Sequence, residues 1–277
     1  METKKAGDFE IPVLGIGTFG IGGEHEADYS KDKEAVKIIR EAIKLGYNHI
    51  DTAESYGNRH SEEIIGKAIK EFDRKKLFIT TKVSKEHLKY DDLINSCKNS
   101  LKRLNTDYID LYLIHEPNPE IPLKETMKAM DYLVENNFIR HIGVSNFNIE
   151  QLKEAQKCTK NKIAANELKY NLWAKIDIKT IKYCQDNNII VIAHKPFGRG
   201  MLFKEKISLL SELSKKYNRT EAQIILNWLI SEKNTVAVFK SENLLHLKEN
   251  LNFSDFQLSQ EDIKRLSGRL NINKTSQ

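Results

Sequence analysis

Asp51-Thr52-Ala53-Glu54-Ser55-Tyr56-Gly57 is the stretch that decides how this chain is interpreted. It follows a short apolar run that ends at Ile50, a pattern that predicts a strand passing into a turn closed by Gly57. Asp51 and Tyr56 are therefore expected to lie near one another where that strand ends. The ordinary pKa of tyrosine is about 10, so a nearby ammonium is needed to lower the pKa of Tyr56 toward neutral pH.

Length and composition limit the possible classes of protein. The chain has 277 residues, 40% of them hydrophobic, which allows a substantial core in one large α/β domain or in two smaller ones. No apolar run approaches the roughly 20 residues that span a bilayer. The charged segment from Met1 to Phe9 lacks the apolar stretch of a signal peptide. The three cysteines are far apart and odd in number, which indicates free thiols in a reducing compartment, so a cytoplasmic location is expected.

The distribution of charged residues and of histidines argues against binding of nucleic acid and of a metal ion. The 44 basic and 39 acidic residues are interspersed along the chain. The densest basic run, Arg74-Lys75-Lys76, is typical of a solvated surface, and no basic stripe with stacking aromatic residues is present. Nucleic acid is therefore not expected as a partner. The eight histidines show no pairing at the spacing of metal ligands, so no metal site is expected.

The apolar periodicity predicts strands that alternate with helices. The predicted strands are Glu10–Ile16, Tyr47–Asp51, Leu77–Val83, Tyr108–His115, Arg140–Ser145, Ile163–Leu168, Ile189–Ala193 and Thr235–Lys240. The predicted helices are Asp32–Leu45 with Gly46 as its C-cap, Glu62–Phe72, Asp91–Leu104, Pro122–Asn136, Ile149–Cys158, Ile178–Asn187, Thr220–Ser231, Ser241–Asn250 and Glu261–Leu270.

Eight strands alternating with helices predict a parallel sheet. Eight such units in about 250 residues match the size of a (β/α)₈ barrel, whose active sites lie at the C-terminal ends of the strands. We therefore expect residues 1–277 to form a single (β/α)₈ TIM barrel domain. A doubly wound open sheet is the structural alternative.

A glycine motif near the start of the chain bears on that alternative. Gly15-Ile16-Gly17-Thr18-Phe19-Gly20 matches the G-x-G-x-x-G pattern of dinucleotide-binding sheets. In those sheets the motif opens a helix directly, so that the helix N-terminus holds the diphosphate. Here the predicted helix begins only at Asp32, which favours a glycine-rich loop after the first strand.

Three polar residues lie at the ends of adjacent predicted strands. Asp51, Lys82 and His115 are expected to converge on one mouth of the barrel, with Tyr56 on the loop beside them. Each residue alone has an ordinary structural explanation. Together they suggest a tyrosine acid with its pKa lowered by Lys82, a carboxylate that holds Lys82, and a second hydrogen-bond donor in His115.

Several motifs in this order resemble the aldo-keto reductase superfamily over nearly the whole chain. They are Pro12-Val13-Leu14-Gly15-Ile16-Gly17-Thr18, the stretch from Asp51 to Gly57, Thr81-Lys82-Val83, Leu113-Ile114-His115-Glu116-Pro117, Ile142-Gly143-Val144-Ser145-Asn146-Phe147, and Lys240-Ser241 followed by Glu249-Asn250. The resemblance implies a (β/α)₈ barrel that binds NADPH without a Rossmann domain, with NADH as a weaker alternative. It also implies the catalytic tetrad Asp51, Tyr56, Lys82 and His115.

In the family's mechanism, the nicotinamide gives a hydride to a carbonyl carbon and the tyrosine protonates the oxygen. Members that reduce steroid carbon–carbon double bonds have glutamate in place of His115, so the resemblance favours reduction of aldehydes and ketones to alcohols. The coenzyme residues that it implies are Thr18, Phe19, Asp51, Ser145, Asn146, Glu167, His194, Pro196, Phe197, Gly198, Lys240, Ser241, Asn243, His246 and Asn250.

Three of these positions depart from the family's pattern. Glu167 stands where glutamine is usual, and a carboxylate can accept a hydrogen bond from the nicotinamide amide but cannot donate one. His194 stands where a stacking tyrosine is usual, and His246 stands where members with strong NADPH preference have arginine.

The expected partner is a small carbonyl compound, and the expected assembly is a monomer. Short segments after His115 and after the last helix predict an open mouth that admits small aldehydes and dicarbonyls. Glu116 either lies at its rim, where it repels anionic carbonyls, or points to solvent. Two other functions stay open: an enzyme acting mainly as an alcohol dehydrogenase, and an interaction subunit like the family's potassium-channel auxiliary subunits.

Overall fold

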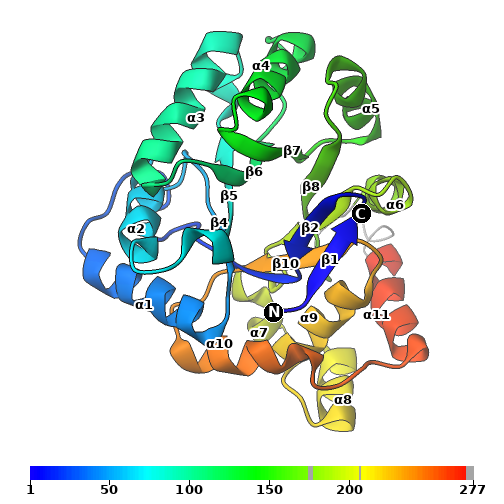
Figure 1. Ribbon diagram of the computed structural model, residues 1–277. Helices are drawn as coiled ribbons and strands as arrows, with labels where there is room; N and C mark the ends of the chain where they lie inside the picture. The colour runs from blue at the N-terminus through cyan, green and yellow to red at the C-terminus, as the bar shows by residue number, and fades with distance from the viewer. Residues whose placement is uncertain (174–176, 206, 273–277) are drawn as a thin grey trace.

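Eight parallel strands close into a barrel in the computed structural model, which describes residues 1–173, 177–205 and 207–272. The strands follow one another around the ring in chain order, and the last pairs with the first (Figure 1). They are β3 (Leu14–Gly17), β4 (His49–Asp51), β5 (Phe78–Val83), β6 (Ile109–Ile114), β7 (Ile139–Ser145), β8 (Ile163–Lys169), β9 (Ile190–His194) and β10 (Thr235–Phe239). The predicted (β/α)₈ barrel is confirmed, and the open sheet is excluded.

Helices surround the barrel and cover its outer face (Figure 1). The α-helices are α1 (Asp32–Leu45), α2 (His60–Ile69), α3 (Tyr90–Leu104), α4 (Leu123–Glu135), α5 (Ile149–Cys158), α6 (Ile178–Asp186), α7 (Met201–Lys204), α8 (Ser208–Tyr217), α9 (Glu221–Ser231), α10 (Leu244–Leu251) and α11 (Gln260–Ile272). Short 3₁₀ turns are η1 (Arg74–Lys76), η2 (Lys85–His87), η3 (Gly198–Gly200) and η4 (Asn252–Ser254).

The first helix shows why its boundaries are readable from the sequence. Gly46 ends α1 in the left-handed conformation, with φ of 110°, and its N–H donates to the carbonyl of Ile43. Both the predicted range of α1 and its glycine cap are confirmed. Helices α7 and α8, by contrast, fall in a segment for which no element was predicted.

An N-terminal hairpin is the main departure from the predicted elements. Strands β1 (Thr3–Ala6) and β2 (Phe9–Pro12) pair antiparallel and lie across the barrel (Figure 1). The prediction of one strand over Glu10–Ile16 is wrong, because Val13 separates β2 from β3 and the two strands belong to different sheets. The physical reason is that β2 has its own partner in β1, which alternation of residue types does not reveal.

The hairpin closes one end of the barrel. Phe9 lies against Phe78, the first residue of β5, with ring centroids 6.0 Å apart. Ala6, Phe9 and Ile11 pack with inward-facing residues of the strands, including Leu111. This apolar plug fills the end at which the strands begin, so the described part of the barrel is open to a ligand at the C-terminal ends of the strands.

The glycine-rich loop after β3 packs against the turn from Asp51 to Gly57. Gly57 has φ of 52°, and a Cβ there would lie 2.3 Å from the carbonyl oxygen of Gly22. The segment after β3 contains no α-helix until α1 begins at Asp32. The prediction of a loop rather than a dinucleotide-binding turn is confirmed.

Cys97, Cys158 and Cys184 are free thiols, as predicted. Among the described residues, every helix is too short or too polar to cross a membrane.

Candidate active site

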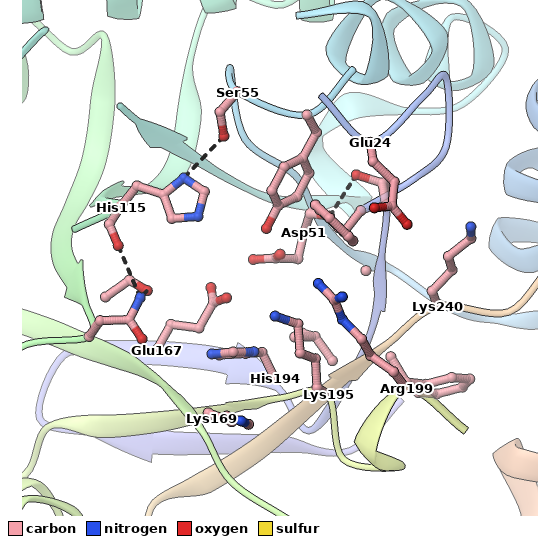
Figure 2. Close-up of a pocket in the computed structure, with 18 of the residues that line it drawn as sticks. Glu24, Asp51, Ser55, His115, Glu167, Lys169, His194, Lys195, Arg199 and Lys240 are labelled. Atoms are coloured by element: carbon pink, nitrogen blue, oxygen red, sulfur yellow. Dashed lines mark hydrogen bonds between the residues drawn. The ribbon is translucent and has the colours of Figure 1, made fainter. Parts of the chain in front are cut away.

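A cavity of about 1000 Å³ opens at the C-terminal ends of the strands. Figure 2 shows side chains from several strands and loops pointing into it. Its lining consists of Gly17, Thr18, Phe19, Glu24, His25, Asp51, Ser55, Tyr56, Ser84, Lys85, Glu86, His115, Glu116, Ser145, Asn146, Glu167, Lys169, His194, Lys195, Pro196, Phe197, Arg199, Gly200, Val238, Phe239 and Lys240.

Lys82 lies behind this lining and is the centre of a buried network. Its Nζ is 2.7 Å from Asp51 Oδ1 and 3.2 Å from Glu167 Oε2. The same ammonium donates to the carbonyl of Thr52 at 3.0 Å and to the Tyr56 hydroxyl at 3.4 Å. The side chain of Lys82 is fully buried, and both carboxyl side chains are nearly so. Asp51, Tyr56, Lys82 and Glu167 thus form one connected cluster.

Burial and the neighbouring opposite charges act in opposite directions on the pKa of Lys82 and on that of Tyr56. Burial alone lowers the pKa of Lys82, but the charges of Asp51 and Glu167 raise it above its usual value. Burial also raises the pKa of Tyr56, and Lys82 opposes that rise only partly. The predicted lowering of the Tyr56 pKa is therefore wrong as a net effect. At neutral pH Tyr56 is a protonated phenol with a proton to give.

Glu167 differs from the carboxylate assumed from the sequence. Burial, followed by the neighbouring charge of Asp51, raises the pKa of Glu167 to about 8. A neutral carboxylic acid has an O–H donor as well as an acceptor. The expectation that Glu167 can only accept hydrogen bonds is wrong near neutral pH, where its side chain resembles the glutamine that it replaces.

His115 follows β6 directly and faces Tyr56 across the cavity. The two ring centroids are 5.7 Å apart, with the ring planes at 76°. Burial, and then the charges of Lys82 and Lys195, lower the pKa of His115 to about 3, so the imidazole is neutral. Ser55 Oγ lies 3.3 Å from His115 Nδ1 (Figure 2). When the hydroxyl donates to Nδ1, the proton of the neutral ring resides on Nε2.

Ser145 and Asn146 extend the site from β7. Ser145 is buried, and Asn146 Nδ2 donates to Ser145 Oγ at 3.0 Å and to the carbonyl of His115 at 3.2 Å. Asn146 has a left-handed backbone, with φ of 61°, and its N–H donates to the carbonyl of Glu167. These contacts tie the ends of β6, β7 and β8 together.

Basic and aromatic side chains form another part of the cavity wall. Lys195 Nζ lies 5.8 Å from the centre of the Phe19 ring, and the Arg199 guanidinium lies 5.2 Å from it. The ring of Phe19 packs edge-on against Tyr56. Figure 2 shows Lys195 and Arg199 extending into the cavity beside His194. Burial, and then the charge of Lys195, lower the pKa of His194 to about 3, which leaves a neutral ring at this position.

The predicted phosphate end lies where β10 passes into α10. Lys240 lines the cavity, and its Nζ is 2.7 Å from a carboxylate oxygen of Glu242. Asn243 accepts from the N–H of Leu245 and so caps α10, a structural function that its sequence position did not indicate. His246 is exposed on the first turns of the helix.

The cavity includes most of the predicted site residues but not all of them. Those outside its lining are Lys82, Gly198, Ser241, Asn243, His246 and Asn250. Lys82 lies behind the lining but contacts the lining residues Asp51, Tyr56 and Glu167. Among lining residues that the sequence did not suggest, Ser55, Lys195 and Arg199 stand out. Their positions in the sequence could have indicated them. Ser55 lies within the turn from Asp51 to Gly57, and Lys195 and Arg199 flank the predicted coenzyme residues Pro196-Phe197-Gly198.

Comparisons with known proteins agree with this geometry. Residues 13–270 match the model of the Aldo/keto reductase family. The chain is 35% identical over 260 residues to the protein named glyoxal reductase from Bacillus subtilis, an alignment that covers 93% of this chain and 88% of that protein.

Two solved structures are also similar. A thermostable aldo-keto reductase in complex with the inhibitor epalrestat has 46% identity and a TM-score of 0.93, covering 97% of this chain and 100% of that one. An aldo-keto reductase from Klebsiella pneumoniae in complex with NADPH has 30% identity and a TM-score of 0.85, covering 97% of this chain and 95% of that one. Since these matches each extend over more than nine-tenths of this chain and agree with its closed barrel, the chain belongs to the aldo/keto reductase family and is an oxidoreductase.

Proposed function

We propose that this protein reduces small aldehydes and ketones to alcohols with NADPH, and that Tyr56 donates the proton. One observation carries the proposal: the phenol of Tyr56 and the neutral imidazole of His115 border the same cavity, and the Lys82 ammonium lies 3.4 Å behind the phenol oxygen. Two hydrogen-bond donors aimed at one place stabilise the negative charge that develops on a carbonyl oxygen.

The proton step follows from the charges around Tyr56. When bound, the reduced nicotinamide supplies the hydride that adds to the carbonyl carbon. The Tyr56 O–H bond breaks as its proton passes to the carbonyl oxygen, which completes the alcohol. The phenolate left on Tyr56 is stabilised by Lys82, whose position is fixed by Asp51 at 2.7 Å.

His115 acts as a donor and not as an acid in this proposal. Its low pKa of about 3 keeps the ring neutral, so Nε2–H donates a hydrogen bond without losing its proton. Ser55 selects that tautomer through Nδ1. The ring therefore orients the carbonyl, while Tyr56 alone changes its protonation state.

The basic wall of the cavity fits the anionic part of the coenzyme. Lys195 and Arg199 lie over Phe19, and neither is held in an ion pair within the described part of the chain. Free cations of this kind suit a diphosphate. Ser145, Asn146 and protonated Glu167 offer donors and acceptors for the nicotinamide amide. The Klebsiella relative in complex with NADPH supports NADPH as the coenzyme. Lys240 is the residue that we assign to the 2′-phosphate, which is absent from NADH.

Small carbonyl compounds fit the open side of the cavity. Glu116 is exposed and lies 3.8 Å from Lys85, so its charge is partly offset at the rim. The relative named glyoxal reductase supports dicarbonyls as substrates. We further propose that residues 1–277 act as one domain and that the protein is a monomer. The molar mass from light scattering tests the monomer.

Turnover of a panel of aldehydes, dicarbonyls and ketones, measured with NADPH and with NADH, tests the proposed function. We expect reduction of small aldehydes and dicarbonyls, faster with NADPH at limiting coenzyme. Tight coenzyme binding without turnover of any carbonyl would overturn the proposal. Faster oxidation of the matching alcohols at neutral pH would instead favour an alcohol dehydrogenase that works mainly in that direction.

A further inference from the structure

The buried cluster around Lys82 holds more acid than base. One ammonium contacts two carboxyl groups, Asp51 at 2.7 Å and Glu167 at 3.2 Å, and all three side chains are at most 4% exposed. If both carboxyl groups were ionised, the cluster would carry a net negative charge away from water. Such a charge is costly unless a second cation or a proton neutralises it.

No second buried cation supplies that neutralisation among the described residues. The titratable and charged groups that face Glu167 come from β4, β5, β8, β9 and the loops after β4, β6 and β9: Asp51, Tyr56, Lys82, His115, Lys169, His194 and Lys195. Tyr56, His115 and His194 are neutral near pH 7. Lys169 is exposed, and Lys195 is only half-buried and lies over Phe19.

The geometry indicates which carboxyl group keeps a proton. Asp51 makes the shorter contact with Lys82, whereas Glu167 lies 0.5 Å farther from the ammonium (3.2 Å against 2.7 Å). Burial, followed by the neighbouring charge of Asp51, raises the pKa of Glu167 to about 8. Glu167 is thus protonated at neutral pH and becomes ionised in mildly alkaline solution, with the proton passing to solvent.

We propose that Glu167 determines which redox form of the nicotinamide coenzyme the site prefers, because it lines the cavity that would hold the nicotinamide and shares a single buried ammonium with Asp51. This inference rests on the proposed function. The oxidised nicotinamide ring is a cation and the reduced ring is neutral. An ionised Glu167 attracts the first and has no comparable attraction for the second.

The comparison of NADP⁺ with NADPH isolates this effect. Both forms carry the same phosphates and the same adenosine, so Lys240, His246 and the titration of the 2′-phosphate affect both alike. Their affinity ratio therefore reports the charge near the ring. By linkage, a site that binds NADP⁺ better when Glu167 is ionised must release a proton when NADP⁺ binds below the pKa of Glu167.

The test measures the dissociation constants of NADP⁺ and NADPH from about pH 6.5 to about pH 9.5 for wild type, Glu167→Gln and Glu116→Gln. We expect the wild-type ratio to move toward NADP⁺ by at least about tenfold over that range, a change equal to about 1.4 kcal/mol. Glu167→Gln keeps the shape and the amide contacts but cannot ionise, so its ratio should be nearly flat. Glu116→Gln removes an exposed carboxylate of the same cavity and should follow wild type.

Calorimetry in two buffers of different ionisation enthalpy gives a second readout. At pH 7 the binding of NADP⁺ should release protons from wild type and few from Glu167→Gln, whereas NADPH binding should release few from either. A wild-type ratio that does not change with pH would overturn the inference, as would a Glu167→Gln variant with the wild-type slope. Failure of the proposed function is distinguishable, because neither coenzyme would then bind or no carbonyl would be reduced.

Discussion

Ser55 Oγ lies 3.3 Å from His115 Nδ1, so a residue next to Tyr56 in sequence orients the imidazole across the cavity. Ser55→Ala removes the hydrogen bond that selects the Nε2–H tautomer. We expect kcat/KM for a small aldehyde to fall by about five- to tenfold, the usual net worth of one hydrogen bond. The dissociation constant of NADPH should stay within about twofold of wild type. An unchanged kcat/KM would show that Nε2–H is fixed without Ser55.

Tyr56→Phe tests the proton donor directly. The ring still packs against Phe19 and His115, so the fold and coenzyme binding should persist. Turnover of aldehydes should fall by at least about 10²-fold, because general acid catalysis typically contributes that much. Single-turnover kinetics with saturating NADPH provide the measurement. Near wild-type turnover would show that Tyr56 is not the acid.

The preference for NADPH over NADH depends on charge at the end of β10. The guanidinium of arginine is always charged and pairs with a phosphate through two parallel hydrogen bonds, so His246→Arg should tighten NADPH and leave NADH nearly unchanged.

A matched variant acts on the ion pair of Lys240. Glu242 occupies the Lys240 ammonium at 2.7 Å and competes with a phosphate for it. Glu242→Gln should tighten NADPH by about two- to fivefold and leave NADH unchanged, since exposed ion pairs are weak. The dissociation constants of NADPH and NADH for wild type and for both variants test these two predictions. A ratio of affinities that His246→Arg does not alter would show that residue 246 does not contact the phosphate.

Substrate selection should favour small carbonyl compounds. We expect aldehydes and dicarbonyls to exceed a steroid ketone in kcat/KM, because the segment beside the cavity between β6 and α4, residues 115–122, is short. Glu116→Gln should improve anionic carbonyls relative to neutral ones by less than about threefold, since Glu116 is exposed and Lys85 lies 3.8 Å away. A steroid or another bulky ketone as the best substrate would refute this prediction.

His49 gives the fold a measurable sensitivity to acid. It is fully buried on β4, and burial lowers its pKa from 6.5 to about 3. Between about pH 6.5 and pH 3, His49 is therefore protonated in the unfolded chain but neutral in the folded chain. The free energy of unfolding falls as the pH drops through that range. From pH 7 to pH 5 this group accounts for about 2 kcal/mol.

Urea denaturation at both pH values measures this contribution. The loss of stability on acidification should be smaller by about 2 kcal/mol in His49→Gln, which cannot titrate. The control is His246→Gln, whose side chain is exposed and should leave the loss unchanged. Equal losses in wild type and His49→Gln would show that His49 is protonated in the folded state.

The sequence predicts the positions of Asp51, Lys82 and His115 well because each lies at or next to the end of a strand with a strong apolar pattern. In parallel strands, such positions share one edge whatever the loops do. The protonation of Glu167 is different. It depends on burial and on the nearby charge of Asp51, which together outweigh the opposing charge of Lys82, and the closed barrel brings these residues together.

The sequence did not predict the β1–β2 hairpin or the basic side chains of Lys195 and Arg199 in the cavity wall, for related reasons. Strand β2 is defined by its pairing with β1 and not by its own residue pattern. Lys195 and Arg199 have left-handed backbones, with φ of 53° and 56°, which turn their side chains in a way that residue type does not predict. Local propensity gives the elements, whereas the tertiary contacts decide which charges meet.

Because β1 and β2 plug one end of the barrel, residues that stabilise the fold there lie at the opposite end from residues that line the cavity. Phe9 and Ile11 fill the end where the strands begin, whereas Asp51 and Glu167 occupy the end where they finish. A protein engineer can therefore repack the hairpin to alter heat resistance, or remodel the opposite loops to alter selectivity, with little interference between the two sets of changes. A fusion partner joined ahead of Thr3 would likewise be tethered on the side of the molecule away from the incoming carbonyl.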